Sequence, residues 1–213
     1  MSEQSERLWK LPEEKRARLL DPAEAEFIKH GYGGASLNRI LNGAKMSKGQ
    51  AYYYITGKSD LYLAVCKRDF SPLLEFAKDQ TKSLHYANDY WIGVESLVGD
   101  LVQRLAADDK VSKLALTVYG SASAMECLEP LTVQLDTILE DIIQAGQQAG
   151  EIRTDLPDGL VRDILKALAR GVDRWFALNA LSLSPQEMAN ASLGTFEMIR
   201  NLVRPMPERD PNA

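Results

Sequence analysis

Two very short helical patterns, one after the other in the N-terminal part of the chain, restrict the fold more than any other feature. Ser36 can cap the first, whose apolar residues between 37 and 44 recur with the i, i+3, i+4, i+7 spacing of one helix face. Ser47 and Gln50 repeat the capping signature three residues after that helix. Two helices this short bury too little apolar surface to be stable alone, so they need neighbouring helices as a platform. The pattern therefore predicts a helix-turn-helix.

The platform is predicted on both sides of this pair. Residues 21–24, Asp-Pro-Ala-Glu, have the form of a helix start, with a capping Asp and a proline at the first helical position. Gly31 is suited to the left-handed C-cap that would end this helix, and Lys58 opens a following helix. We therefore expect four short helices between residues 21 and 63. Pro22 is expected to kink or restart the first of them, because proline removes the hydrogen bond to the carbonyl of Arg18.

Helical periodicity continues through the rest of the chain, and no segment shows the strict alternation of a half-buried strand. We therefore expect an all-α protein. Two long apolar stripes, over residues 161–176 and 188–203, are separated by a helix start at Ser184-Pro185. The expected organisation is an N-terminal helix-turn-helix domain at 12–58, a larger helical domain at 59–204, and disordered tails at 1–11 and 205–213.

Charge is distributed unevenly along a chain whose formal net charge is -5. Residues 1–60 hold 10 basic and 8 acidic side chains, whereas residues 61–213 hold 15 and 22. No acidic residue lies between Phe27 and Ser59, a window that contains Lys29, Arg39, Lys45, Lys48 and Lys58. Because binding to duplex DNA depends on neutralising phosphates, this window is the candidate electrostatic footprint.

Several other classes of protein find no support in the sequence. Cys66 and Cys127 form no CxxC pair, and no stretch approaches the roughly 18 unbroken apolar residues of a membrane span. The polar N-terminus lacks a leader's apolar region, so we expect a cytoplasmic protein without membrane partners. His30 and His85 are the only histidines, and neither an ExxH pair nor a nucleotide or hydrolase motif occurs. We expect no enzymatic activity, no metal site and no cofactor.

The exposed positions of the two short helices carry side chains suited to DNA. The helix N-terminus at Ser47 presents free amides to a phosphate, and Lys48 adds a positive charge beside them. Gln50 and Asn38 can hydrogen-bond base edges. Gly49 lets the backbone lie close to the duplex.

The string GYGGASLNRILNGAKMSKGQAYYYITGKSDLYLAV resembles the signature of the TetR (tetracycline-repressor) family, in which a hydroxyl-capped helix, an SKG turn and a Tyr-rich recognition helix precede a K-x-x-L helix start. The match covers roughly a fifth of the chain and many positions at once. The resemblance implies phosphate contacts for Ser36, Tyr52 and Lys58. It implies base-facing roles for Asn38, Lys48, Gly49, Gln50 and Tyr53, and core positions for Ile40, Ala51 and Ile55.

The chain departs from the family pattern at a few positions. Lys45 stands where the family commonly has glycine in the turn, and a positive φ there would be strained for a lysine. Ala51 and Ile55 replace bulkier residues. These departures affect the tilt of the recognition helix more than its existence.

For the second domain the resemblance implies architecture more than residue roles. The segment AGQQAGEIRTDLP resembles the junction before the family's dimerisation helices, which implies a homodimer through residues 157–203 as a four-helix bundle. A small-molecule effector is implied among the middle helices, with a shared site near Trp91 and Tyr119 as the specific hypothesis. The candidate ligand residues are Tyr86, Tyr90, Trp91, Tyr119, Met125, Trp175 and Phe176. Bound ligand would shift the helix that begins at Lys58 and release a repressor from a palindromic operator.

Other interpretations of the ligand-binding, dimerisation and DNA-binding residues remain open. The aromatic candidates could each be ordinary core residues. The apolar stripes of residues 161–176 and 188–203 could both be buried within one subunit. A helical regulator that acts through protein contacts without touching DNA is the main functional alternative. The acid-free window favours DNA, because a protein-docking surface gains nothing from excluding carboxylates.

Overall fold

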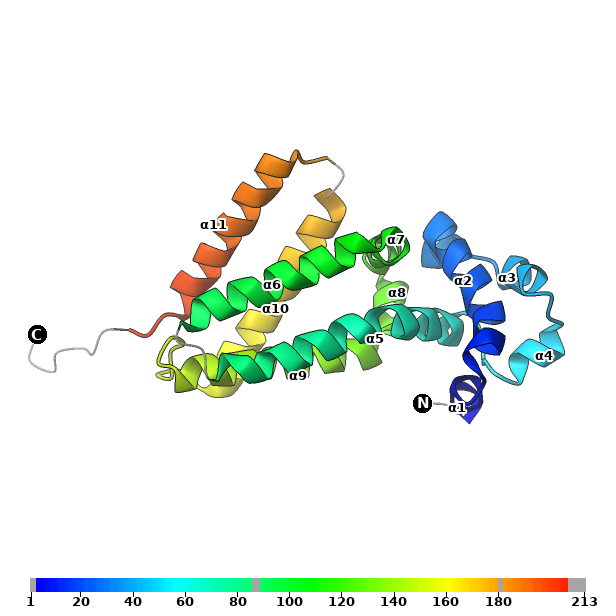
Figure 1. Cartoon of the computed structure of the whole chain (residues 1–213), viewed down its shortest axis with the longest axis horizontal. Helices are drawn as coiled ribbons and strands as arrows, with labels where there is room; N and C mark the ends of the chain where they lie inside the picture. Colours follow the sequence, from blue (N-terminus) through cyan, green and yellow to red (C-terminus); the bar gives the residue numbers. More distant parts are fainter. Residues whose placement is uncertain (1–2, 86–88, 180–181, 207–213) are drawn as a thin grey trace, which may run out of the picture. The chain divides into compact units, whose positions relative to one another are not determined.

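The computed structural model describes residues 3–85, 89–179 and 182–206, and within these ranges it contains helices and no strand (Figure 1). The expectation of an all-α protein is confirmed. None of the described helices is long and apolar enough to pass through a lipid bilayer. In chain order the helices are α1 (Glu3–Trp9), α2 (Glu13–Gly34), α3 (Leu37–Gly43), α4 (Lys48–Tyr52), α5 (Lys58–Leu84), α6 (Tyr90–Ala107), α7 (Asp109–Val118), α8 (Ala122–Cys127), α9 (Glu129–Gln148), α10 (Asp158–Asn179) and α11 (Pro185–Val203).

The helices gather into two compact units whose limits differ from the expected domains. Unit 1 comprises residues 1–74 and 104–133, and unit 2 comprises residues 75–103 and 134–213. The N-terminal unit is larger than the expected domain 12–58, because α7 and α8 pack against α2 and the first half of α5 belongs with them. A boundary at a helix start was the natural expectation, but the observed one falls inside α5.

An aromatic cluster forms the core of unit 1. Phe27 of α2 and Tyr62 of α5 are fully buried and meet edge to face, with ring centroids 4.8 Å apart. Tyr32 lies 5.1 Å from the Tyr62 ring. The Tyr62 hydroxyl shares a 2.9 Å hydrogen bond with the hydroxyl of Thr117 on α7, so a buried polar group is satisfied where three helices meet.

Helix α2 starts earlier than expected. It begins at Glu13, so the expectation of a start at Asp21 is wrong, and the helix runs through Pro22 without interruption. Nine residues of helix before the proline supply hydrogen bonds that outweigh the one lost at the carbonyl of Arg18. The break comes at Gly31, whose φ of 64° and ψ of 172° leave the helical region, as the glycine predicted.

The N-terminal residues, expected to be a disordered tail, instead form helix α1 from residue 3 onward. Leu8 is 1% exposed and Ser5 is also buried. The Trp9 ring lies under the cations of Arg16 on α2 and Lys67 on α5, at 4.8 and 5.2 Å. Tertiary contacts of this kind fix a helix that is far too short to form alone. Of the expected C-terminal tail, residues 205–206 continue beyond α11 without helical structure, and residues 207–213 lie outside the described ranges.

Unit 2 is assembled from the second half of α5 with α6, α9, α10 and α11. The buried Trp91 of α6 meets Phe196 of α11 edge to face, with centroids 5.7 Å apart, and donates its indole N–H to Glu151 at 2.9 Å. Lys166 of α10 bonds Asp136 and Glu140 of α9 at 3.2 and 3.1 Å. The two long final helices predicted from the apolar stripes are present.

Candidate nucleic-acid interface

Both short helices begin at the serines that the sequence indicated. The Ser36 hydroxyl accepts the backbone N–H of Arg39 at 3.4 Å and so caps α3. At α4 the Ser47 hydroxyl accepts the Gln50 N–H at 3.3 Å while the Gln50 side-chain oxygen accepts the Ser47 N–H at 2.9 Å. This reciprocal pair is a capping box, and it satisfies two of the free amides of α4.

The turn between α3 and α4 has the geometry expected of a family that usually places glycine in it. Lys45 has a φ of 52°, the only positive φ at a non-glycine among the described residues. Its N–H donates to Asn42 O at 3.1 Å, and the Met46 N–H donates to Leu41 O at 3.0 Å. These two bonds make a Schellman ending in which position C′ is left-handed. A lysine therefore occupies a backbone conformation that suits glycine.

Two charged side chains, Glu26 and Lys58, connect this motif to the neighbouring helices. The Glu26 carboxylate of α2 accepts the Ser36 N–H and the Arg39 Nε–H, both at 2.8 Å. The hydrogen bond from Arg39 holds the pKa of Glu26 below its usual value. At the other end, the Lys58 ammonium donates to Gly33 O and Ala35 O at 3.3 Å each and lies 4.8 Å from the Tyr32 ring. Lys58 thus ties the start of α5 to the end of α2, which leaves one of its three donors for another partner.

A close backbone approach also sets where α3 sits. A Cβ built on Gly43 would lie 3.1 Å from the Cβ of Pro22. The end of α3 therefore rests directly on the proline ring of α2. A larger residue at position 43 would push α3 away from α2.

Seven of the nine predicted DNA-binding residues are exposed. Ile40, Ala51 and Ile55 are buried, as the resemblance implied. Helix α4 ends at Tyr52, earlier than the expected Ile55, because the N–H groups of Tyr54 and Ile55 both turn back to the carbonyl of Ala51. The exposed side chains of the set are Asn38, Ser47, Lys48, Gly49, Gln50, Tyr52 (46%) and Tyr53 (55%), whereas Ser36 and Lys58 are half-buried.

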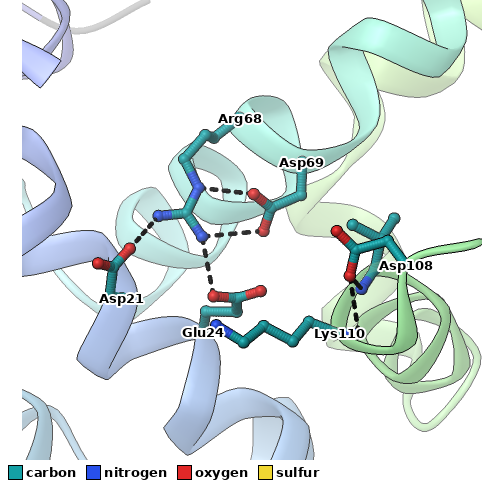
Figure 2. A network of polar contacts seen from close by, with 7 residues as sticks. Asp21, Glu24, Arg68, Asp69, Asp108 and Lys110 are labelled. Atoms are coloured by element: carbon teal, nitrogen blue, oxygen red, sulfur yellow. Dashed lines mark hydrogen bonds and ion pairs between the residues drawn. The ribbon is translucent and has the colours of Figure 1, made fainter.

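A cluster of charged side chains around Arg68 joins α2 to α5 (Figure 2). Arg68 of α5 donates to Asp21 and Glu24 of α2 at 2.6 and 3.0 Å and to its neighbour Asp69 at 2.6 Å. Burial, reinforced by the Asp69 charge, raises the pKa of Glu24. Lys110 of α7 lies beside the same carboxylate in Figure 2. Sequence reasoning missed this cluster because its partners stand 44 residues apart in the chain.

The predicted ligand residues are divided between the two units. Tyr119, half-buried after α7, and the exposed Met125 of α8 belong to unit 1, so the hypothesis of a shared site near Trp91 and Tyr119 stays a prediction. Tyr90 is buried and donates to Ile142 O at 2.9 Å, and burial raises its pKa. Tyr86 lies outside the described residues.

Two hollows occur within unit 2. One of about 250 Å³ lies between α10 and α11 and is lined by Trp175, Phe176, Gly171 and Thr195 among others. The other, of about 280 Å³, is lined by Tyr90, His85, Gln148 and Glu151, of which His85 and Gln148 are hydrogen-bonded at 3.0 Å. Both are at or below the small end of the range for drug-sized ligand pockets.

Taken together, a capped and exposed short helix on a helical platform, within a sequence window from Phe27 to Ser59 whose charged residues are all basic, defines a helix-turn-helix DNA-binding protein. Residues 19–65 match the family model described as bacterial regulatory proteins of the tetR family. That segment of the chain is therefore similar to the DNA-binding part of this family, and the chain is a DNA-binding transcriptional regulator.

Similarity extends well beyond the helix-turn-helix. The chain is 22% identical over 196 residues to the HTH-type transcriptional repressor Rv1474c of Mycobacterium tuberculosis, which covers 89% of this chain and 93% of that protein. SmeT, the repressor of a Stenotrophomonas maltophilia multidrug efflux pump, is similar with a TM-score of 0.67 at 16% identity, over 97% of this chain and 96% of its own. FadR from Bacillus subtilis, solved with stearoyl-CoA, has a TM-score of 0.66 at 17% identity, over 88% and 98%. At such identities the two solved structures share the fold.

Proposed function

We propose that this protein is a repressor that binds a palindromic operator as a homodimer and leaves it when a small molecule binds to the helical domain that follows the helix-turn-helix. One observation carries the DNA-binding part of the proposal: every charged side chain from Phe27 to Ser59 is basic, and this window contains the exposed helix α4. Four of the five cations in it are exposed, namely Lys29, Arg39, Lys45 and Lys48. Such a surface neutralises phosphates while α4 enters the major groove.

Each exposed residue has a role that fits its chemistry. Lys48 stands in the first turn of α4, where its charge adds to the free amides of the helix N-terminus at a phosphate. Tyr52 has an exposed side chain whose hydroxyl can bind the DNA backbone. Ser36 and the third N–H donor of Lys58 can contact phosphates on either side. Asn38, Gly49, Gln50 and Tyr53 form the face toward the bases.

An uncovered apolar stripe on α10 supports the proposed homodimer. Leu160, Ile164, Trp175 and Leu178 are between 43% and 61% exposed. At 100° per residue they fall within about 60° of one another on the helix. The small residues Ala167 and Gly171 lie on the same face and are also exposed.

The occupant proposed for this stripe is the same stripe on a second copy. On α11, Met198 and Leu202 are also exposed and lie about 40° apart, while exposed Leu193 lies on another face of that helix. A two-fold contact of this kind would present two copies of α4 and so would match a palindromic site. The hollow at Trp175 and Phe176 then belongs to the dimer interface rather than to a ligand pocket.

The effector is proposed as a small molecule that binds the helical domain after the helix-turn-helix, in keeping with the ligand-bound structure of the similar FadR. A ligand releases DNA only if it binds the DNA-free arrangement more tightly than the DNA-bound one. Candidate compounds can be screened by release of labelled DNA from the protein. Tryptophan fluorescence of the Trp91→Ala and Tyr119→Ala variants then tests the specific hypothesis, and unchanged affinity in both variants would remove it.

The experiment that tests the function is footprinting of the purified protein on the DNA that flanks its own gene, followed by titration at several salt concentrations. A protected palindrome and binding that weakens steeply with salt are the expected results. A target that binds equally well at low and high salt, and is a protein, would support the alternative of a regulator that acts through protein contacts.

A further inference from the structure

Helix α1 places a guanidinium against the recognition segment. The Arg7 Cζ lies 4.6 Å from the centre of the Tyr53 ring. Tyr53 is the C-cap residue of α4, and its ring meets Tyr54 edge to face at 5.0 Å. More than half of Tyr53 remains exposed although Arg7 covers part of it. A cation in this position borders the surface that is proposed to meet DNA.

The position of Arg7 is built into the fold and does not depend on the flexibility of a chain end. Leu8, the next residue, is buried, and Trp9 is held between the cations of Arg16 and Lys67. The Arg16 Nη1 also donates to the Trp9 carbonyl at 3.4 Å. Three consecutive residues of α1 therefore have defined tertiary partners, and the guanidinium of Arg7 starts from a restricted set of conformations.

The charge partner of Arg7 is weak and replaceable. Its guanidinium pairs with Glu3, one turn earlier on α1, whose side chain is 75% exposed. Exposed pairs of this kind contribute little to stability, so a phosphate with its two charge-bearing oxygens can replace the carboxylate. Because a guanidinium has five N–H donors, Arg7 can stay over the Tyr53 ring and still make a bidentate contact with a phosphate.

We infer that Arg7 binds a DNA backbone phosphate beside the site read by α4, so that α1 extends the DNA-binding surface beyond the helix-turn-helix. The inference rests on the proposed orientation of α4 on DNA. On binding, Arg7 exchanges Glu3 for a phosphate and stays stacked on Tyr53. A dimer would make this contact twice, once at each outer flank of the operator.

The test compares full-length variants on the duplex that the wild-type protein selects from a random pool, with affinity measured across a salt series. Arg7→Gln is expected to lower affinity on the order of tenfold and to flatten the slope of log K against log[salt] by about 0.9 for each phosphate that the variant no longer neutralises. Arg7→Lys keeps the charge and is expected to keep most of the slope. Glu3→Gln removes the competing carboxylate and is expected to tighten binding.

Controls separate this inference from the function on which it rests. Lys10→Gln removes one positive charge near the same helix without touching α4, and it is expected to change the slope less than Arg7→Gln does. A lower affinity of Arg7→Gln with an unchanged slope would overturn the inference, because Arg7 would then only position Tyr53. An equal effect of Lys10→Gln would overturn it as well. Failure of the wild-type protein to select any duplex would instead refute the proposed function.

Discussion

Arg68 of α5 donates a 3.0 Å hydrogen bond to the buried carboxylate of Glu24 on α2, and the same guanidinium holds Asp69 at 2.6 Å. One cation thereby balances two carboxylates that have little access to water. Without that cation both carboxylates would remain desolvated and close together. The platform of the helix-turn-helix is therefore expected to depend strongly on Arg68.

Arg68→Met is expected to lower the free energy of unfolding by about 3 kcal/mol, because it leaves buried carboxylates unpaired. Chemical denaturation at neutral pH measures this. The matched control is Lys82→Met on the same helix, where the pair with Asp79 is largely exposed and its loss is expected to cost little. Equal effects of the two substitutions would contradict the role given to Arg68.

Glu26→Gln is expected to destabilise the protein at neutral pH and to matter less in acid. The hydrogen bond from Arg39 lowers the pKa of Glu26 below its ordinary 4.5, so the ionised carboxylate stabilises the folded state. That contribution is complete above about pH 4.5 and is lost as pH falls through the lowered pKa of the folded state. The measurement is the free energy of unfolding of wild type and variant at pH 7 and in acid. The difference between the two proteins is expected to shrink as the pH falls. A gap that stays constant would show that the charge on Glu26 is irrelevant.

Gln50→Glu and Gln50→Met separate helix capping from DNA reading. The glutamate still accepts the Ser47 N–H, so thermal stability is expected to hold, whereas methionine loses the capping box and about 1 kcal/mol. Both variants lose the amide donor and are expected to bind operator DNA more weakly, the glutamate most because phosphates repel it. Melting temperatures and DNA titrations of the same samples provide the comparison. Full affinity in Gln50→Met would remove Gln50 from the reading surface.

Lys45→Gly is expected to stabilise the protein by about 1 kcal/mol, because glycine adopts the positive φ without the steric cost a lysine bears. Lys45→Ala is the matched control. It removes the same charge but keeps a Cβ in the left-handed conformation, so no gain is expected. A stability of Lys45→Gly equal to that of Lys45→Ala would mean that backbone strain at this position is negligible.

Trp175→Glu is expected to convert the proposed dimer to a monomer, because it places a charge within the exposed α10 stripe. Ile92→Glu is the control, since Ile92 is an even more exposed apolar residue and stands on α6 rather than on α10. Light scattering after size-exclusion chromatography distinguishes the two masses. A Trp175→Glu dimer that persists at low micromolar concentration would disprove the proposed interface.

Local signals explain what the sequence could predict. The caps at Ser36 and Ser47, the break at Gly31 and the start at Lys58 each depend on residues within one helical turn, and all four were confirmed. The positive φ that a lysine would find awkward at position 45 is also present. Short-range chemistry of this kind is visible in the order of residues alone.

Features that depend on residues far apart in the chain could not be predicted from the sequence. The polar sequence of α1 has no helical signal of its own, and the helix exists because Leu8 and Trp9 find partners in other helices. The early start of α2 was masked by the stronger start signal at Asp21 and Pro22. The Arg68 cluster and the contact of Arg7 with Tyr53 join residues far apart in the chain, and no periodicity encodes such pairs.

The two ties between α2 and α5 also limit how the start of α5 can move. Lys58 and Arg68 bind the α2 region from two positions that lie about 15 Å apart along α5. Residues 58–68 and α2 are therefore expected to move together as one rigid body. Pro72 lies four residues after Arg68 and deprives its carbonyl of a helical hydrogen bond. The weakest part of the α5 hydrogen-bond ladder thus follows directly after Arg68. Bending of α5 at this position would leave the arrangement of α2, α3 and α4 unchanged.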